Sequence, residues 1–162
     1  MPARDPAGAP AVAGWTADAE AMLGHFRTMF TADPLVFDKW LALSASIRGD
    51  DVIDRIKAIL ADPAFPANNP NRLRSLVGSF AMGNTTQFAR TDGAGFRFVT
   101  EFVTDVDKRN PQVAARVLTA FRSWRSFEPV RMAAAETALT ALRDAGGLSR
   151  NTADILERTL AG

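Results

Sequence analysis

The sequence contains no cysteine, no tyrosine and a single histidine, His25, among its 162 residues. The lack of cysteine excludes disulfides, thiolate zinc sites and cysteine nucleophiles. It also fits a reducing compartment, so we expect a cytoplasmic protein. A zinc site of the His-Glu-x-x-His type needs two histidines one helical turn apart, which one histidine cannot supply. We therefore predict no catalytic, cofactor-binding or metal-binding residue in this chain.

His25 is the one residue on which a Ser-His-Asp mechanism would have to depend. It lies amid Leu23, Phe26 and Phe30, in a segment with the apolar spacing of a helix. We expect His25 to be a partly packed or surface residue of that helix and not a general base.

The sequence also lacks an excess of positive or negative charge and has no long apolar run. The chain has 19 basic and 18 acidic residues, for a net charge of +1. This balance gives no overall field to attract nucleic acid or an anionic membrane. No apolar run approaches the roughly 18 residues of a membrane span, and residues 1–6 lack the order of a signal peptide. We expect neither nucleic acid nor a membrane as a partner.

What the sequence does contain is helical periodicity. Residues 1–14 are rich in Ala, Pro and Gly without a period, and we interpret them as a tail or linker. Residues 15–162 form the predicted domain, of about nine helices joined by short loops, with no strand-period segment of useful length. Consecutive antiparallel pairs would stack into an armadillo- or HEAT-like α-solenoid, an all-α fold. An irregular helix bundle is the structural alternative.

Capping residues, often followed by proline, mark the predicted helix starts. The helix after Asp33-Pro34 is apolar around much of its circumference, so we expect it to be covered on more than one side. Gly146-Gly147 is a stop signal. The other predicted starts are Thr16, Asp50 or Asp51, Asn69-Pro70, Asn84, Asn110-Pro111, Glu128-Pro129 and Ser149.

Two stretches repeat one pattern, an Asn-Pro start followed by an arginine within two turns. In the first, residues 69–80 read NPNRLRSLVGSF and include Arg74. In the second, residues 110–116 read NPQVAAR and end on Arg116. In the first stretch the apolar residues fall on one narrow helical arc, which predicts a buried helix. These apolar residues are Leu73, Leu76, Val77 and Phe80.

These stretches carry a family resemblance. NPNRLRSLVGSF and the segment DGAGFRFVTEFVTDVDKRNPQVAARV, residues 92–117, resemble the C-terminal helical domain of bacterial aminopeptidase N, a zinc metallopeptidase. The resemblance runs from about Asp38 to the C-terminus. The family's Gly-Ala-Met-Glu-Asn and His-Glu-x-x-His motifs do not occur in this sequence. The resemblance therefore implies a non-catalytic domain whose zinc belongs to a catalytic domain elsewhere in the parent enzyme.

The resemblance also implies what such a domain does. It would cap the catalytic chamber, restrict access to it and help to position a peptide substrate. Its partners would be the catalytic domain of the same polypeptide and the peptide itself. Arg74 and Arg116 would line the substrate channel and meet the downstream part of the peptide or its carboxylate. The alternative is that both arginines only pair with acids or cap carbonyls between neighbouring helices.

Two further groups of residues have simpler interpretations than a binding site. We expect Glu101, Asp105 and Asp107 to form a solvated face and not a metal or acid–base cluster. We expect the aromatic group with Arg97 to pack in the core and not to stack on bases. This group comprises Phe96, Phe98 and Phe102. Trp40, Trp124 and Phe127 are expected core or inter-helix anchors.

A different class of function also stays open. The chain could be a free-standing helical-repeat adaptor that binds a partner protein on a concave surface. An enzyme in its own right is poorly supported, because the residues for metal or nucleophilic chemistry are missing.

Overall fold

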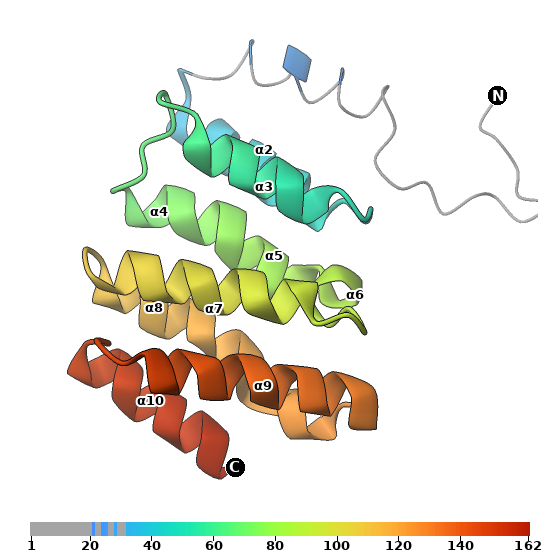
Figure 1. Cartoon of the computed structure of the whole chain (residues 1–162). Coiled ribbons are helices and arrows are strands. Elements are labelled where there is room, and N and C mark those ends of the chain that lie inside the picture. Colours follow the sequence, from blue (N-terminus) through green and yellow to red (C-terminus); the bar gives the residue numbers. More distant parts are fainter. Residues whose placement is uncertain (1–20, 22–23, 26–27, 29–31) are drawn as a thin grey trace, which may run out of the picture.

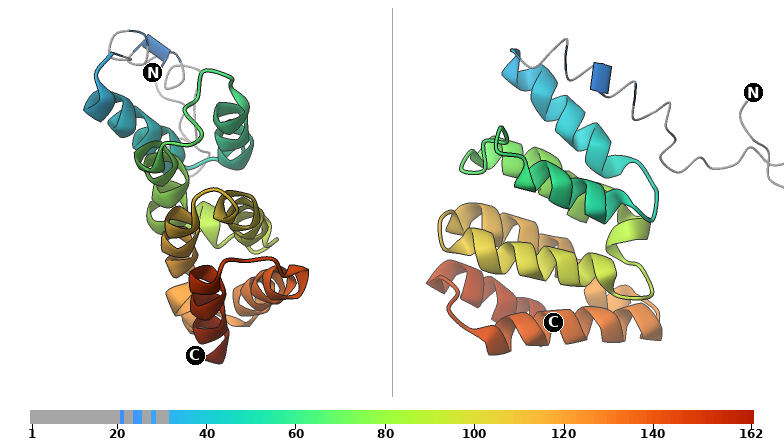
Figure 2. Two further views of the ribbon diagram at one scale, coloured as in Figure 1. Left: turned by 90° about the vertical axis from the view of Figure 1, so that its left-hand side faces the viewer. Right: turned by 45° about the horizontal axis from the view of Figure 1, so that its top comes forward.

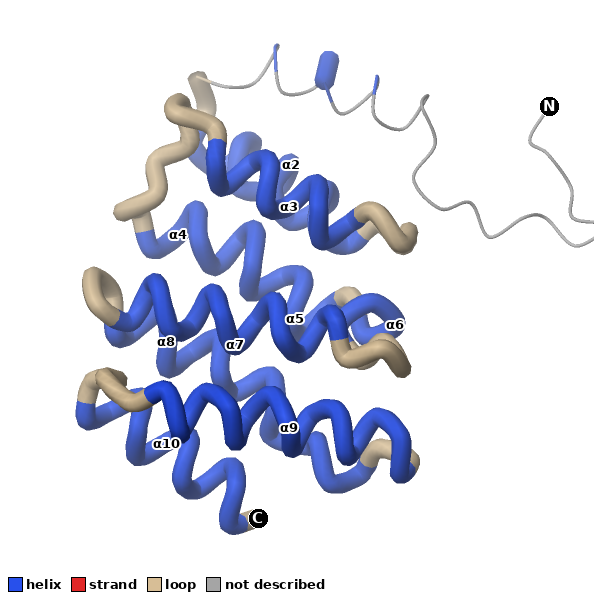
Figure 3. Tube along the Cα trace, in the orientation of Figure 1, coloured by secondary structure: helices blue, strands red, loops and turns tan. Residues whose placement is uncertain are grey.

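The computed structural model describes residues 21, 24–25, 28 and 32–162 of the chain. Within them the regular elements are helices joined by short loops, and no strand occurs (Figure 3). The predicted tail, residues 1–14, and most of the predicted helix 16–32 lie outside the described residues. The described elements are α2 (Pro34–Ser46), α3 (Val52–Ala61), α4 (Pro70–Leu73), the π-helical η1 (Arg74–Gly78), α5 (Ser79–Gly83), α6 (Thr85–Phe88), α7 (Ala94–Asp107), α8 (Pro111–Leu118), the 3₁₀-helical η2 (Thr119–Ser126), α9 (Pro129–Ala145) and α10 (Arg150–Ala161).

These helices are stacked in two rows (Figures 1 and 2). The first row contains α2, then α4 with η1 and α5, then α8 with η2, and finally α10; the second contains α3, α7 and α9. All helices of the first row begin at the same edge of the stack, and those of the second row run back toward it. The predicted armadillo-like solenoid of antiparallel pairs is confirmed. No described helix is both long enough and apolar enough to cross a membrane.

Side-chain caps set where the helices start. The side-chain oxygens of Asp33, Asn69, Asn110 and Glu128 accept backbone N–H bonds from the first turn of α2, α4, α8 and α9. In each case proline follows, where its missing N–H costs nothing and its fixed φ suits a helix. Ser149 caps α10 without a proline. All five predicted starts are confirmed.

Two other predicted caps differ in their contacts. Asp51 is the residue before α3, but its carboxylate pairs with Arg55 at 2.5 Å and makes no capping bond. Asn84 precedes α6, yet its buried side chain reaches back to the end of α2. There its amide nitrogen donates to the carbonyl oxygens of Ala45 (2.9 Å) and Ile47 (3.3 Å). A buried carbonyl without a partner is costly, so Asn84 ties α2 to the α5–α6 corner.

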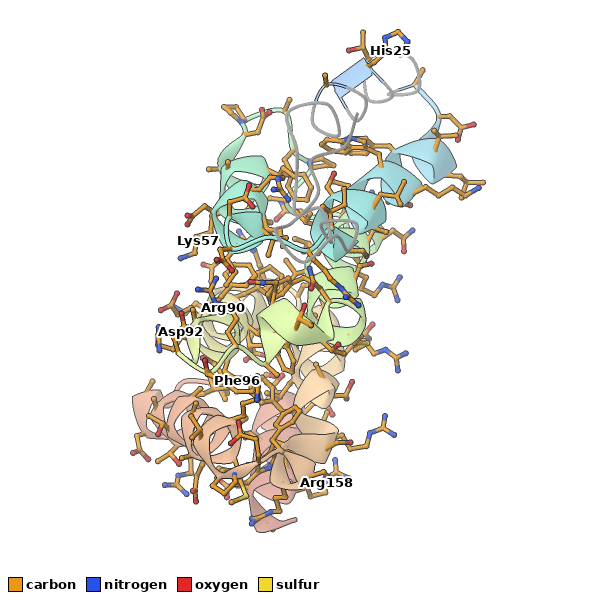
Figure 4. The ribbon with its side chains drawn as sticks, turned by 90° about the vertical axis from the view of Figure 1, so that its right-hand side faces the viewer. His25, Lys57, Arg90, Asp92, Phe96 and Arg158 are labelled. Atoms are coloured by element: carbon orange, nitrogen blue, oxygen red, sulfur yellow. The ribbon has the colours of Figure 1, made fainter. Side chains whose placement is uncertain are left out.

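An aromatic cluster forms the middle of the core. Phe88 lies edge-on to both Phe96 and Phe121, with ring centroids 5.0 and 5.1 Å apart, and Phe80 lies edge-on to Phe98 at 5.5 Å. These edge-to-face contacts are favourable aromatic geometries. All five rings are buried, and Figure 4 shows Phe96 in the interior of the stack. The predicted core role of the aromatic residues is therefore confirmed.

The turn before α7 depends on two glycines. Gly93 adopts a φ of +72°, in the left-handed region that favours glycine. Gly95 serves a different purpose, because α7 starts against the end of α6. A Cβ atom at Gly95 would lie 2.2 Å from the carbonyl oxygens of both Gln87 and Phe88. The close approach of α6 and α7 requires a residue without a side chain.

Asp107 forms a buried junction between α7 and α10. Its carboxylate accepts hydrogen bonds from the Ser149 backbone N–H, from the Ser149 hydroxyl at 2.7 Å and from the Thr152 hydroxyl. Asp107 is only 3% exposed. The prediction of a solvated acidic face is therefore wrong for Asp107, which anchors the start of α10, and correct for Glu101 and Asp105, which are exposed.

Helix α2 is the outermost helix of the first row. Within the described part of the chain, other residues cover only one side of it. Trp40 and Leu41 of α2 are buried, whereas Leu35 and Leu43 are 73% and 51% exposed. The prediction that this helix is covered on more than one side is not met within the described part of the chain.

We predict that Gly95→Ala destabilises the fold by about 3 kcal/mol or more, because the new methyl group overlaps two carbonyl oxygens. Gly78→Ala is the matched control. At Gly78 the nearest atom to a new Cβ is the Arg74 Cβ, at 3.8 Å, so we expect a neutral or slightly stabilising change. Urea denaturation followed by circular dichroism measures both, and equal midpoints for the two variants would contradict the proposed close approach.

We predict that Asp107→Ala costs about 3 kcal/mol, because it leaves the half-buried Ser149 and the buried Thr152 donors without an acceptor. Hydrogen exchange should show α10 opening well before α3. Asp105→Ala is the control, since Asp105 makes an exposed ion pair with Arg109 at 2.7 Å, worth less than about 1 kcal/mol. Unchanged protection of α10 in Asp107→Ala would rule out the junction.

Candidate functional site

The repeated Asn-Pro pattern of the sequence becomes a spatial repeat in the fold. Asn69 and Asn110 start neighbouring helices of the first row, and both helices begin at the same edge (Figure 1). Arg74 is five residues beyond its cap and Arg116 six residues beyond its own. Because the two helices run in parallel and η1 packs against α8, the arginines lie at corresponding heights on adjacent helices.

Arg74 and Arg116 line one groove of about 480 Å³, which we call the Arg74–Arg116 groove. Both arginines are exposed. The Arg74 guanidinium donates to the side-chain oxygen of Asn71, a neutral partner that leaves its charge uncompensated. The other residues that line the groove are Ser46, Gly78, Ser79, Met82, Gly83 and Val117, none of which is acidic.

The π-helical turn η1 shapes the floor of this groove. It runs from Arg74 to Gly78, between α4 and α5, and packs against both α2 and α8. Single π turns inside α-helices occur frequently at functional sites. Gly78 contributes no side chain to the floor, and a Cβ there would still meet only the Arg74 Cβ. The sequence predicted an uninterrupted helix here and gave no signal for the π turn.

A second groove of about 400 Å³ continues from the first, with Met82 and Arg116 in common. It runs between α5–α6 and η2, and Phe88 and Phe127 provide its apolar walls. Arg122 is its second charged residue, and it too has no acidic lining residue. Arg122 was not predicted from the sequence as a site residue, because its position beside Arg116 depends on how α8 continues into η2.

The opposite face contains charges of both signs. Arg90 pairs there with Asp92 at 2.8 Å, and Figure 4 shows both side chains at the edge away from Arg158. The Ala94 backbone N–H and the Arg90 side chain hold the pKa of the Asp92 carboxyl below its ordinary value. Arg97 donates to the Asp92 carbonyl oxygen at 2.8 Å. These contacts stabilise the start of α7, and acidic and basic side chains alternate on this face.

Other candidate residues do not form a site. His25 is helical and exposed, at the end of the stack opposite Arg158 (Figure 4). Among the residues that the structure describes, no group of three or more His, Cys, Asp or Glu side chains could hold a metal ion. The side chains of the described residues therefore do not present the donor set of a zinc site.

Comparison with known proteins places this arrangement in a family. A model described as a domain of unknown function (DUF3458_C) with ARM repeats matches residues 8–161. The chain belongs to the DUF3458_C family. The match begins earlier than the resemblance detected from Asp38 onward, and its ARM-repeat description agrees with the stacked helix pairs.

Relatives of this DUF3458_C chain are named aminopeptidase N. It is 38% identical over 141 residues to the protein of Haemophilus influenzae, and these cover 87% of this chain and 16% of the relative. It is 32% identical over 142 residues to the Escherichia coli protein, covering 88% of this chain and 16% of that protein. The resemblance to aminopeptidase N is thus confirmed, although the chain spans only about a sixth of the length of these relatives.

A solved structure supports the same relation. The DUF3458_C fold superimposes on the crystal structure of Legionella pneumophila aminopeptidase A in complex with aspartic acid, with a TM-score of 0.82 and 26% sequence identity. The superposition covers 89% of this chain and 17% of that one. This fold therefore occurs as one part of a larger aminopeptidase chain.

We predict that residues 74 and 116 can be joined across the groove. Since the sequence has no cysteine, the double variant Arg74→Cys/Arg116→Cys carries only the two introduced thiols. A short bismaleimide should link them within one molecule, seen as a faster band on a denaturing gel. Arg74→Cys/Arg143→Cys is the control, because Arg143 lies at the end of α9 in the other row. Equal linking of both pairs would contradict the shared groove.

Proposed function

We propose that this chain is the non-catalytic C-terminal domain of a zinc-dependent aminopeptidase N. In that role it caps the catalytic chamber, restricts access to it and helps to position the peptide. The observation that carries the proposal is the Arg74–Arg116 groove, which has two guanidinium groups and no acidic lining residue. The aminopeptidase relatives support the assignment to this enzyme class.

The chemistry of the groove favours a carboxylate ligand. A guanidinium group is always charged and presents a planar fork of donors that matches a carboxylate or a peptide carbonyl. The hydrogen bond from Arg74 to Asn71 holds one guanidinium in place before a ligand arrives. A peptide held by its N-terminus at a zinc centre would extend its downstream end, and finally its α-carboxylate, toward Arg74 and Arg116.

The zinc and the residues that hydrolyse the peptide bond would belong to the missing catalytic domain. This domain is the proposed partner within the same polypeptide. The exposed apolar residues Leu35 and Leu43 on α2 offer a surface against which other parts of that polypeptide could pack. Burial of such side chains would stabilise the association by roughly 1.5–3 kcal/mol each.

The test is kinetic and uses the full-length enzyme. We predict that Arg74→Ala and Arg116→Ala each raise KM for a tripeptide about tenfold, the effect of losing one charge-assisted hydrogen bond of about 1.4 kcal/mol, with kcat little changed. Hydrolysis of a single-residue aminoacyl reporter should be unaffected, because it does not reach the groove.

Two controls sharpen this experiment. Arg109→Ala removes an exposed arginine that lines neither of these two grooves and should leave KM unchanged. A tripeptide with an amidated C-terminus should lose most of its sensitivity to the groove variants. Unchanged KM for the free-acid peptide in both variants would contradict a positioning role and favour purely structural arginines.

The alternative hypothesis, a free-standing adaptor, predicts a smaller native polypeptide than the aminopeptidase hypothesis does. An antibody against this chain should detect a band several times larger than 17.5 kDa in extracts of the source cells. The immunoprecipitate should contain chelator-sensitive aminopeptidase activity. A band of 17.5 kDa without activity would instead support the adaptor.

A further inference from the structure

A third groove, of about 430 Å³, lies between η2 and α10. Three of its lining residues are arginines, Arg122, Arg125 and Arg158, and none of its side chains is acidic, although Gly162, the last residue of the sequence, also lines it with its carboxylate group. It shares Thr119 and Arg122 with the second groove, which in turn shares Arg116 with the Arg74–Arg116 groove. The three grooves therefore form one path along the first row of helices. We call this third part the η2–α10 groove.

The backbone of η2 directs two of these arginines to the same side. Residues three apart are eclipsed in a 3₁₀-helix, and Arg122 and Arg125 have this spacing. Ser123, with φ −103° and ψ 19°, departs from helical geometry between them and bends the segment. In an α-helix the same spacing would also leave the two side chains only about 60° apart around the axis, so their shared side follows from the three-residue spacing.

The floor of the η2–α10 groove is fixed by packing. Trp124 is 2% exposed, and its indole nitrogen donates to the Thr159 carbonyl oxygen at 2.8 Å. The Arg125 guanidinium lies over the Trp124 ring, 4.5 Å from its centroid, and donates to the Leu160 carbonyl oxygen. Arg158 extends along α10, with its Nε donating to the Asp154 carbonyl oxygen at 3.2 Å. All of these acceptors are neutral backbone groups.

The positive charge along this path is local and uncompensated. None of its five arginines, at 74, 116, 122, 125 and 158, forms an ion pair in the described part of the chain. By contrast, six other arginines each pair with a carboxylate. These six are Arg55, Arg72, Arg90, Arg109, Arg131 and Arg143. A chain with a net charge of only +1 thus places five unpaired arginines along one row of helices, while Arg48, Arg97 and Arg150 also form no ion pair among the described residues.

We propose that the η2–α10 groove binds acidic side chains of a peptide that lies along the first row, so that the path prefers peptides with Asp or Glu residues. Arg122 and Arg158 form ion pairs with the carboxylates, and the half-buried Ile155 contacts the methylene groups of a glutamate side chain. The direction in which the peptide lies along the path rests on the proposed function. Binding in the groove, in contrast, can be measured on this chain alone.

The test is fluorescence anisotropy with the 162-residue chain and two labelled peptides, (Gly-Glu)₅ and (Gly-Gln)₅. We expect tighter binding of the acidic peptide, weakened by added salt. Arg122→Gln and Arg158→Gln should each weaken it about two- to fivefold, the range of a partly exposed ion pair. Arg150→Gln is the matched control, because Arg150 is exposed on the same helix and lines none of the three grooves; its effect should stay below about 1.5-fold.

Each other result has a distinct meaning. Equal affinity for the two peptides, or an equal loss in Arg150→Gln, would overturn the proposal in favour of diffuse charge. Losses only in Arg74→Gln and Arg116→Gln would overturn it while leaving the proposed function intact. A single-stranded oligonucleotide that displaces (Gly-Glu)₅ at lower concentration, with the same dependence on Arg122 and Arg158, would overturn the assignment to peptides. Circular dichroism on each variant confirms that the fold is retained.

Discussion

The stack depends on one constraint: a helix with an apolar face cannot bury it alone, and short loops force its neighbour to run back beside it. Every helix of the first row therefore begins at the same edge (Figure 1). Caps such as Asn69 and Asn110 then fix where each helix starts. Because these starts are in register, similar positions on successive helices become neighbours, and one row can present a line of like side chains.

The polar contacts inside the stack serve this register. Asn84 joins the end of α2 to the α5–α6 corner, and Asp107 joins the end of α7 to the start of α10. Both groups are buried and satisfied, so a shift of either helix would leave donors or acceptors without partners. These buried contacts therefore fix the relative positions of the helices that carry the row of arginines.

Much of the fold could be predicted from the sequence, and the reasons for the failures are physical. Caps followed by proline and the apolar arcs are local signals, so the capped starts of α2, α4, α8 and α9 were predicted correctly. Asp107 was not, because its partners Ser149 and Thr152 are more than forty residues away and only the fold brings them together. The π turn at Arg74–Gly78 and the exposed face of α2 likewise depend on neighbouring helices.

For the candidate site, the sequence selected Arg74 and Arg116 through a family resemblance, and the fold places both on one groove. It did not select Arg122 and Arg158, which come together only where η2 packs beside α10. The most direct test is a crystal structure of the full-length polypeptide with a non-hydrolysable peptide bound. The account predicts the guanidinium groups of Arg74 and Arg116 within about 3 Å of oxygen atoms in the downstream part of that peptide. A first row of helices turned away from the peptide and toward solvent would contradict it.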